Sequence, residues 1–216
     1  MIGNVYLLGG GEIDKNETEL IDAFVLSHTK KDGDIIFVGA ASGDDEEYFE
    51  SFKKVYNDGS KIVFLTSGST NNDFTIAIAN AKIVYLGGGS TEVLQHQLDK
   101  WGAKSTFVKA LRNGTDFVGM SAGAYVLSQY YIHKENESYE IRSGLGLVSI
   151  VTQVHSTIKQ EKSANKLLES NGKTVPLVAI TEKSALLITE NKTVAIGNGH
   201  ITRYNSEQNI SLILED

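Results

Sequence analysis

The sequence of 216 residues contains no cysteine and one proline, Pro176. The absence of cysteine excludes disulfide bonds, thiolate metal sites and a cysteine nucleophile. No apolar run approaches the roughly 18 residues of a membrane-spanning helix. The first eight residues also lack the basic start and the long apolar run of a secretory signal. We therefore expect a cytoplasmic protein that has no membrane partner and whose turns depend on its 21 glycines.

Basic segments are also missing. The chain has 27 acidic against 20 basic residues and a formal net charge of −7. Because a nucleic-acid backbone requires a basic face, we expect no nucleic-acid partner. With 41% hydrophobic residues, the chain has enough apolar material for a packed core. No linker or repeat interrupts it, so we expect a single domain over residues 1–216, as a monomer or a homodimer.

Strands and helices alternate in the first half of the chain. Apolar runs typical of buried strands occur at residues 5–8, 34–39, 61–65, 80–86 and 116–118. Helices are predicted at residues 17–26, 45–56, 91–101 and 107–112, and another begins after Ser121. Continuous Val and Ile runs separated by helices predict an α/β fold with three layers, in which a mostly parallel sheet carries helices on both faces.

The second half of the chain has a different pattern. Residues 130–142 are polar and are predicted to form a surface loop or hairpin, which we expect to set the depth of the site. An apolar run at 146–151 leads to His155, and a helix is predicted at 160–170. Short strands are predicted at 177–180, 184–189, 193–196 and 210–214, which indicates an antiparallel extension of the sheet.

Residues 119–123, Gly-Met-Ser-Ala-Gly, form the most informative segment. A serine between two glycines, where a strand turns sharply into a helix, is the pattern of a nucleophile elbow. Such a turn holds the Ser121 hydroxyl away from the sheet. The N–H of Ala122 lies at the helix N-terminus, where backbone donors have no helical partner and can stabilise an oxyanion.

A serine nucleophile requires a base and an acid that orients the base. Of the five histidines, His155 is the best candidate for the base, because it follows a predicted strand. The other four lie at a helix end, within a helix, in the polar loop and in a turn: His28, His96, His133 and His200. Glu182 follows a strand in the same way and is a candidate acid. The competing acids lie in the polar loop: Glu135, Glu137 and Glu140.

Two glycine turns, at residues 9–11 and 87–89, also follow predicted strands. Sites in parallel sheets lie outside the carboxyl ends of strands, so these turns and Ser121 can share one edge. Neither turn has the Walker pattern or the third glycine of the G-x-G-x-x-G fingerprint, so we expect no nucleotide cofactor. An N–H group of one turn can complete the oxyanion hole with Ala122. The chain has no His-x-x-x-His or His-Glu-x-x-His motif, so we expect no metal.

Four segments carry a family resemblance. They are residues 83–91 (Ile-Val-Tyr-Leu-Gly-Gly-Gly-Ser-Thr), residues 119–124 (Gly-Met-Ser-Ala-Gly-Ala), His155, and residues 181–185 (Thr-Glu-Lys-Ser-Ala). In this order and spacing they resemble the peptidase E (S51) family of serine peptidases, which includes α-aspartyl dipeptidase and cyanophycinase. The resemblance covers nearly the whole chain, from the first strand to Ile196.

This resemblance implies a flavodoxin-like fold similar to class I glutamine amidotransferases, with serine at the position of their cysteine. It implies that Ser121 is the nucleophile and His155 the base, and that Gly89 and Ala122 supply the oxyanion N–H groups. The acid differs within the family. The match of residues 184–185 to cyanophycinase-like members favours Glu182.

The substrate preference is less well defined by the resemblance, which implies short peptides such as dipeptides with an N-terminal Asp. Relatives carry arginines after the catalytic histidine that are not obvious in residues 156–162. Lys159 and Lys162 lie there, but a lysine lacks the bidentate fork of arginine. The preference for Asp is therefore left open.

We accordingly predict a serine exopeptidase that hydrolyses short peptides through an acyl-enzyme on Ser121. A second hypothesis is an α/β-hydrolase-type esterase with Ser121, Glu182 and His200, because that chain order fits the fold. A third is a non-catalytic amidotransferase-like module that binds a small ligand. Hydrolysis that depends on His155 rather than His200 would favour the peptidase, and a bound metabolite without hydrolysis would favour the module.

Overall fold

The computed structural model describes residues 1–135, 138–171, 175–204 and 209–215, without the side chains of Glu135, Ile158 and Lys159. Strands and helices alternate up to residue 127 in the order β1 Val5–Leu8, η1 Ile13–Lys15 (a 3-10 helix), α1 Glu19–His28, β2 Asp34–Val38, η2 Ala40–Ser42 (3-10), α2 Glu46–Val55, β3 Ile62–Leu65, α3 Asn71–Asn80, β4 Ala81–Leu86, α4 Thr91–Lys100, α5 Ala103–Arg112, β5 Asp116–Met120 and α6 Ala122–Leu127. The remaining elements are β6 Ser128–Glu135, β7 Ser138–Ser143, β8 Val148–Gln153, α7 Ile158–Ser170, β9 Leu177–Ile180, β10 Ser184–Ile188, β11 Thr193–Gly197 and β12 Ile201–Tyr204. Within the described ranges, none of the helices has the length and apolar character that a membrane span requires.

The central layer is a seven-stranded sheet in the order β11-β10-β1-β5-β4-β2-β3. The strands from β1 to β3 in this order are parallel, and β10 and β11 extend the sheet in antiparallel pairing. The predicted α/β fold is confirmed. Because β5 lies between β1 and β4, the turns after these three strands meet at one edge of the sheet, as their positions in the sequence suggested.

A second sheet has five strands in the order β12-β9-β8-β6-β7 and is absent from the sequence prediction. Residues 130–135 and 138–142 lie in its antiparallel strands β6 and β7. The expected antiparallel extension is wrong for residues 177–180, because β9 pairs in parallel with β8 in this second sheet. The strand expected at residues 210–214 is also wrong, since this segment makes only an isolated bridge between Leu212 and Val148. Instead of this segment, β12 pairs with β9 at the edge of the second sheet.

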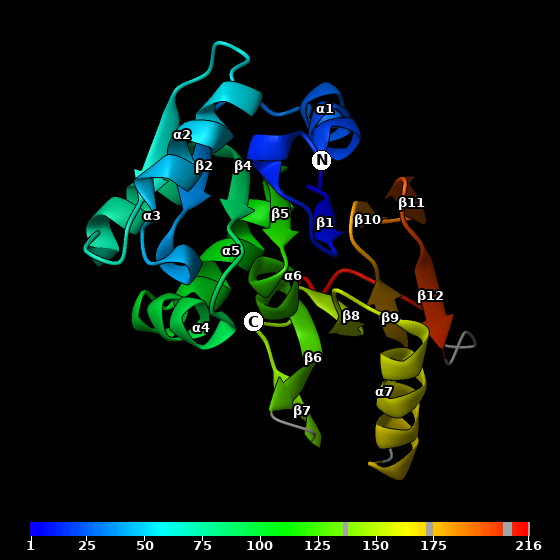
Figure 1. Ribbon diagram of the computed structural model, residues 1–216. Helices are drawn as coiled ribbons and strands as arrows, with labels where there is room; N and C mark the ends of the chain where they lie inside the picture. Colours follow the sequence, from blue (N-terminus) through cyan, green and yellow to red (C-terminus); the bar gives the residue numbers. More distant parts are fainter. Residues whose placement is uncertain (136–137, 172–174, 205–208, 216) are drawn as a thin grey trace.

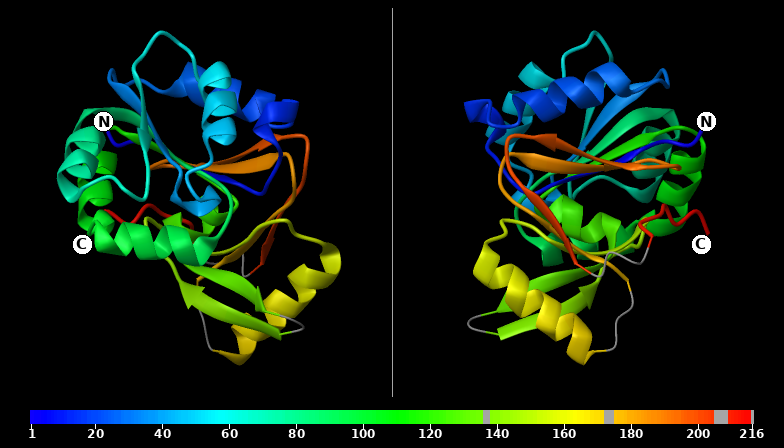
Figure 2. Two further views of the ribbon diagram at one scale, coloured as in Figure 1. Left: turned by 60° about the vertical axis from the view of Figure 1, so that its left-hand side comes forward. Right: turned by 90° about the vertical axis from the view of Figure 1, so that its right-hand side faces the viewer.

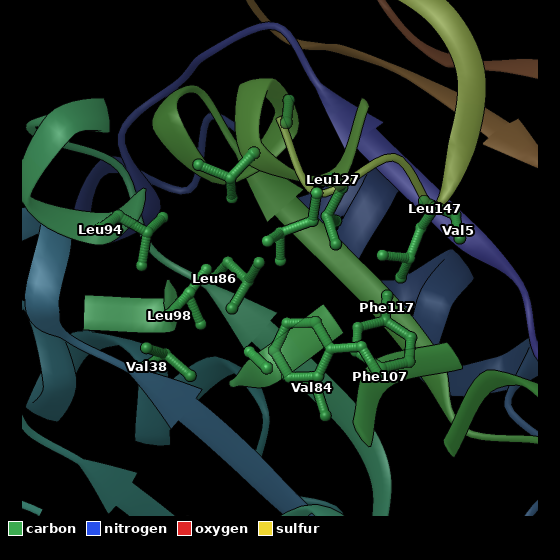
Figure 3. Packing of buried hydrophobic residues seen from close by; sticks show 14 of the residues in the cluster. Val5, Val38, Val84, Leu86, Leu94, Leu98, Phe107, Phe117, Leu127 and Leu147 are labelled. Atoms are coloured by element: carbon green, nitrogen blue, oxygen red, sulfur yellow. The ribbon is translucent and has the colours of Figure 1, made fainter. Parts of the chain in front are cut away.

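Two hydrophobic cores lie on the two faces of the seven-stranded sheet. Successive side chains of a strand point to opposite faces, so Tyr6 and Leu8 pack toward α1 and α2, whereas Val5 and Leu7 belong to the other core. That other core contains side chains of α3 to α6 and of the second sheet. Figure 3 shows part of it, where side chains of α4 and α5 such as Leu94 and Phe107 pack against strands of the central sheet. A third, smaller cluster lies between α7 and the second sheet. Figures 1 and 2 show the resulting layers, with α7 on the far side of the second sheet from the central one.

Candidate active site

Ser121 occupies the turn between β5 and α6. Its backbone has φ 50° and ψ −102°, in a region that residues other than glycine rarely adopt. The flanking glycines allow the turn to pack. A Cβ on Gly119 would lie 2.5 Å from the carbonyl carbon of Gly123, and a Cβ on Gly123 would lie 2.3 Å from the Leu86 carbonyl oxygen. The two glycines and the strained serine therefore form one local structure, as the elbow pattern predicts.

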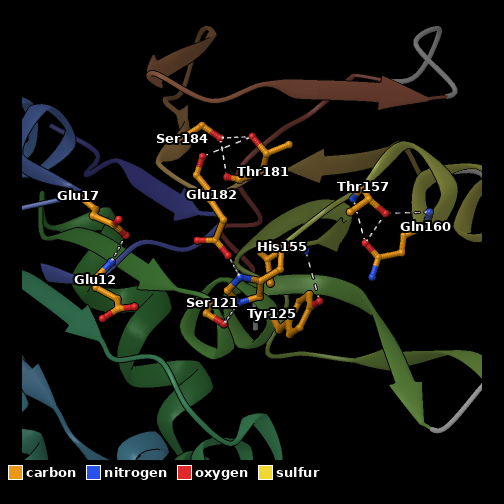
Figure 4. A network of polar contacts seen from close by, with 11 residues as sticks. Glu12, Glu17, Ser121, Tyr125, His155, Thr157, Gln160, Thr181, Glu182 and Ser184 are labelled. Atoms are coloured by element: carbon orange, nitrogen blue, oxygen red, sulfur yellow. Dashed lines mark hydrogen bonds and ion pairs between the residues drawn. The ribbon is translucent and has the colours of Figure 1, made fainter. Parts of the chain in front are cut away.

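A chain of hydrogen bonds connects Ser121, His155 and Glu182 (Figure 4). The Ser121 Oγ lies 2.7 Å from His155 Nε2, and His155 Nδ1 is bonded to Glu182 Oε1. An ionised carboxylate only accepts hydrogen bonds. It therefore places the imidazole proton on Nδ1 and leaves Nε2 free to accept the proton of the serine hydroxyl. The side chains of His155 and Glu182 are 49% and 52% exposed, so a substrate can reach them from solvent.

Three successive carbonyl groups at the end of β1 hold the segments that carry these side chains. Each accepts a hydrogen bond from a main-chain N–H group; the pairs are Leu8 with Ser121 (3.1 Å), Gly9 with His155 (3.0 Å) and Gly10 with Lys183 (3.1 Å). Lys183 directly follows Glu182 in the chain. One short stretch of backbone thus sets the relative positions of all three groups.

At two of these positions a side chain would collide with neighbouring atoms, so either the glycine is kept or those atoms must move. A Cβ on Gly9 would lie 2.1 Å from the carbonyl oxygen of Thr181, and a Cβ on Gly10 would lie 2.1 Å from Glu182 Oε2 and 2.7 Å from His155 Cε1. The sequence argument considered residues 9–11 only as possible oxyanion donors and missed this positioning role. The available signal was a run of three glycines at the end of a strand.

The predicted oxyanion donors are Gly89 and Ala122. Gly89 lines the same cavity as Ser121, and its φ of 134° and a Cβ position 2.1 Å from the Ala41 carbonyl oxygen restrict this position to glycine. Ala122 is the first residue of α6, where N–H groups have no partner within the helix. Among the described residues, no protein acceptor is recorded for either N–H. Their role as oxyanion donors stays a prediction.

A cavity of about 890 Å³ opens beside Ser121. Its lining comes from residues 10–14 and Glu17 after β1, from the N-cap and first turns of α2, and from the turns after β4 and β5. The remaining lining residues are His155, Glu182 and Lys183. We expected residues 130–142 to set the depth of the site, but none of the described residues of that segment lines the cavity; residues 136–137 lie outside the described residues. The walls are instead η1 and α2. No group of three or more His, Cys, Asp or Glu side chains in the described part of the chain could hold a metal ion.

Comparison with known proteins identifies the family. A model of peptidase family S51 matches residues 5–196. The chain belongs to this peptidase family. It is 27% identical over 124 residues to the uncharacterized peptidase YgaJ of Bacillus subtilis (strain 168), a match that covers 56% of this chain and 54%, about half, of that protein. It is 23% identical over 163 residues to the uncharacterized peptidase PM1590 of Pasteurella multocida (strain Pm70), with coverage of 67% and 79%.

Solved structures share the fold. A candidate peptidase E protein from Listeria monocytogenes EGD-e superposes with a TM-score of 0.65 at 18% sequence identity, over 90% of this chain and 98% of that one. A peptidase from an acI-B1 Actinobacterium superposes with a TM-score of 0.64 at 21% identity, over 94% of each chain. At these sequence identities, the structural similarity establishes the fold of this S51 family member but not its substrate.

The competing acids and the alternative base of this S51 family member make contacts away from Ser121. Glu140, on β7, pairs with Arg142, whereas Glu137 and the side chain of Glu135 lie outside the described residues. His200 lies between β11 and β12, and its main chain pairs with Thr181. No hydrogen bond between the His200 ring and Ser121 or Glu182 is present in the part of the chain that the structure describes. The geometry therefore favours Glu182 as the acid and His155 as the base.

Proposed function

We propose that this S51 peptidase is a serine exopeptidase that hydrolyses short peptides in the cytoplasm. The observation that carries the proposal is the hydrogen-bonded order of Ser121, His155 and Glu182 in the wall of one cavity. A nucleophile bonded to a base, which is bonded in turn to an orienting acid, is the arrangement that unrelated acyl-transfer enzymes share.

In the proposed reaction, the Ser121 hydroxyl attacks the scissile carbonyl carbon and His155 Nε2 accepts its proton. The oxyanion accepts hydrogen bonds from the N–H groups of Gly89 and Ala122, each worth about 2.7–4 kcal/mol in comparable enzymes. His155 then donates its proton to the leaving amine, which departs as the C–N bond breaks. A water molecule, deprotonated by the same imidazole, releases the acyl group from Ser121. Glu182 stabilises the imidazolium in both halves of the reaction.

The size of the cavity supports short substrates. Sites for small ligands commonly enclose roughly 300–1,000 Å³, and a volume of about 890 Å³ falls within this range. The resemblance to α-aspartyl dipeptidase suggests that dipeptides with an N-terminal Asp should be tested first. A panel of dipeptides measures the side-chain preference in the same experiment.

The test is amine release from Asp-Leu, Glu-Leu, Asn-Leu, Ala-Leu and β-Asp-Arg, with Ser121→Ala as the control. We expect hydrolysis of at least one peptide and its loss in the variant. Hydrolysis that persists in the folded variant would contradict a serine mechanism. If the folded wild-type protein turns over no peptide, the proposed activity is wrong, and the alternative of a non-catalytic module that binds a small ligand gains support.

A further inference from the structure

The loop of residues 87–90, which follows β4, lies beside the proposed nucleophile. A Cβ built on Gly88 would lie 3.6 Å from the Ser121 Cβ, and Gly88 and Gly89 line the same cavity as Ser121. Donors that stabilise an oxyanion act because they are already in place before the reaction begins. The position of this loop therefore decides which of its N–H groups can reach an oxyanion formed at Ser121.

Three of the four main-chain N–H groups in this loop donate hydrogen bonds within the protein. The donor and acceptor pairs are Gly87 with the Val38 carbonyl oxygen (3.3 Å), Gly88 with the Tyr48 hydroxyl oxygen (3.4 Å) and Ser90 with the Ala41 carbonyl oxygen (2.8 Å). Among the described residues, the N–H of Gly89 has no protein acceptor. This pattern leaves one N–H of the loop for a substrate, and that N–H is the predicted oxyanion donor.

Tyr48 differs from the other two acceptors because it is a side chain and belongs to α2. Burial raises the pKa of Tyr48 above its ordinary value of 10.0, although the hydrogen bond from Gly88 opposes this change. The hydroxyl is therefore neutral in the pH range of a peptidase assay, and its oxygen accepts the Gly88 N–H through a lone pair. A single substitution can remove this contact and leave the two main-chain contacts of the loop unchanged.

The ring of Tyr48 is fixed against the same loop. Asp45 accepts the main-chain N–H of Tyr48 at 3.0 Å and so caps α2. The ring makes an edge-to-face contact with Phe37, with the ring centroids 5.0 Å apart. A Cβ built on Gly87 would lie 3.3 Å from Tyr48 Cε1. Because packing holds the ring in place, its hydroxyl can set the position of Gly88.

We propose that Tyr48 is a positioning residue of the oxyanion hole. By accepting the Gly88 N–H, it fixes one side of the peptide group between Gly88 and Gly89, and the Ser90 N–H fixes the other side. That peptide group carries the Gly89 N–H. Tyr48 thus acts on the reaction through Gly89 rather than by touching the reacting atoms. The inference rests on the proposed peptidase function and adds a residue to its machinery.

Tyr48→Phe tests this role, because it removes the hydroxyl and keeps the ring. With the best dipeptide of the panel above, we expect kcat to fall on the order of 10-fold while KM stays within about 2-fold of wild type, since the oxyanion contact is made only in the transition state. Removing an oxyanion donor outright costs about 10²–10³-fold, and here the donor is displaced rather than removed. A wild-type kcat, or a change confined to KM, would overturn the inference.

Tyr56→Phe is the matched control for the loss of a tyrosine hydroxyl. Tyr56 lies at the C-cap of α2 and is buried, and its hydroxyl donates to Asp22 at 2.8 Å. Tyr56 does not line the cavity. We expect this variant to lower the melting temperature and to keep the wild-type kcat. Equal falls of kcat in the two variants would assign the effect of Tyr48→Phe to general destabilisation and overturn the positioning role.

Amide hydrogen exchange, measured by NMR, separates this inference from the proposed function because it requires no turnover. In Tyr48→Phe we expect the Gly88 amide to exchange about 3- to 10-fold faster than in wild type, the effect of losing one hydrogen bond. The Ser90 amide, which donates to Ala41, should keep its wild-type rate. This result supports the holding of the loop by Tyr48 even if the wild-type protein hydrolyses no peptide, an outcome that would overturn the peptidase function alone. An unchanged Gly88 rate in a protein that does hydrolyse peptides would overturn the inference and leave the peptidase function in place.

Discussion

The main-chain N–H of His155 donates a hydrogen bond to the carbonyl oxygen of Gly9 at 3.0 Å. The carbonyl groups on either side of Gly9 accept N–H groups from Ser121 and Lys183 in the same way. The backbone of Ser121, His155 and Lys183 has positive φ, between 50° and 59°. Three segments from different parts of the chain, each with a residue of positive φ, are therefore held by one short stretch of backbone, Leu8–Gly10. Main-chain hydrogen bonds from this stretch thus position the residues of the proposed catalytic triad.

Gly10→Ala is expected to reduce the rate of peptide hydrolysis on the order of 100-fold. The new Cβ would lie 2.1 Å from Glu182 Oε2, so the carboxylate must move away from His155. A displacement of about 1 Å in a catalytic group can reduce the rate by about 100-fold. Activity and melting temperature should be measured together. Gly59→Ala is the control, because Gly59 also has positive φ but no atom within 4 Å of the added Cβ. Full activity in Gly10→Ala would contradict the positioning role.

Glu182→Gln tests the identity of the acid. The amide removes the negative charge that stabilises the imidazolium, so we expect kcat to fall by about 10²–10⁴-fold with a smaller change in KM. Glu140→Gln is the comparison, because Glu140 is a competing acid that pairs with Arg142 in the structure. Steady-state kinetics on the best peptide should leave this second variant near the wild-type rate. The opposite pattern would assign the acid to the β6–β7 hairpin.

The central sheet and the catalytic candidates could be predicted from the sequence because their signals are local. Apolar runs mark the parallel strands, and Ser121, His155 and Glu182 each follow an apolar run. The second sheet could not be predicted in this way. The short strand at residues 177–180 looks the same whether it pairs with β10 or with β8, and only long-range packing decides between them.

The helix α3 is absent from the sequence prediction. The chain from Ser67 to Asp73 is polar throughout, with one glycine. In the structure, Thr70 and Asp73 form a capping box, in which each side chain accepts the main-chain N–H of the other residue. The spacing of a threonine and an acid three residues apart was the available signal.

Thr70→Ala should therefore destabilise the protein by about 1 kcal/mol, the usual cost of removing an N-cap side chain. Urea unfolding of the variant, compared with Asn72→Ala in the exposed first turn of the same helix, measures this cost. The cap variant should shift the unfolding midpoint more than the control. Equal midpoints would mean that packing of Phe74 and Ile78 into the core holds α3 without the cap.

A buried carboxyl outside the active site predicts a dependence of stability on pH. Asp22, in α1, accepts hydrogen bonds from the hydroxyl groups of Thr18 at 2.7 Å and Tyr56 at 2.8 Å. Burial raises the pKa of Asp22 from its ordinary value of 3.8 to about 6, although the two hydrogen bonds oppose this change. The folded state consequently binds the Asp22 proton more tightly than the unfolded state does.

The sign of the effect follows from this difference. Between about pH 4 and about pH 6 the folded state holds more protons, so the contribution of Asp22 to the free energy of unfolding decreases as the pH rises. Above this range the charged, buried carboxylate costs on the order of 3 kcal/mol. Asp22→Asn removes that cost, so its stability relative to wild type should increase from pH 4 to pH 7. Urea unfolding across this range measures the difference, with Glu19→Gln, at an exposed position of the same helix, as the control. Parallel curves for wild type and Asp22→Asn would show that Asp22 is already ionised without penalty in the folded protein.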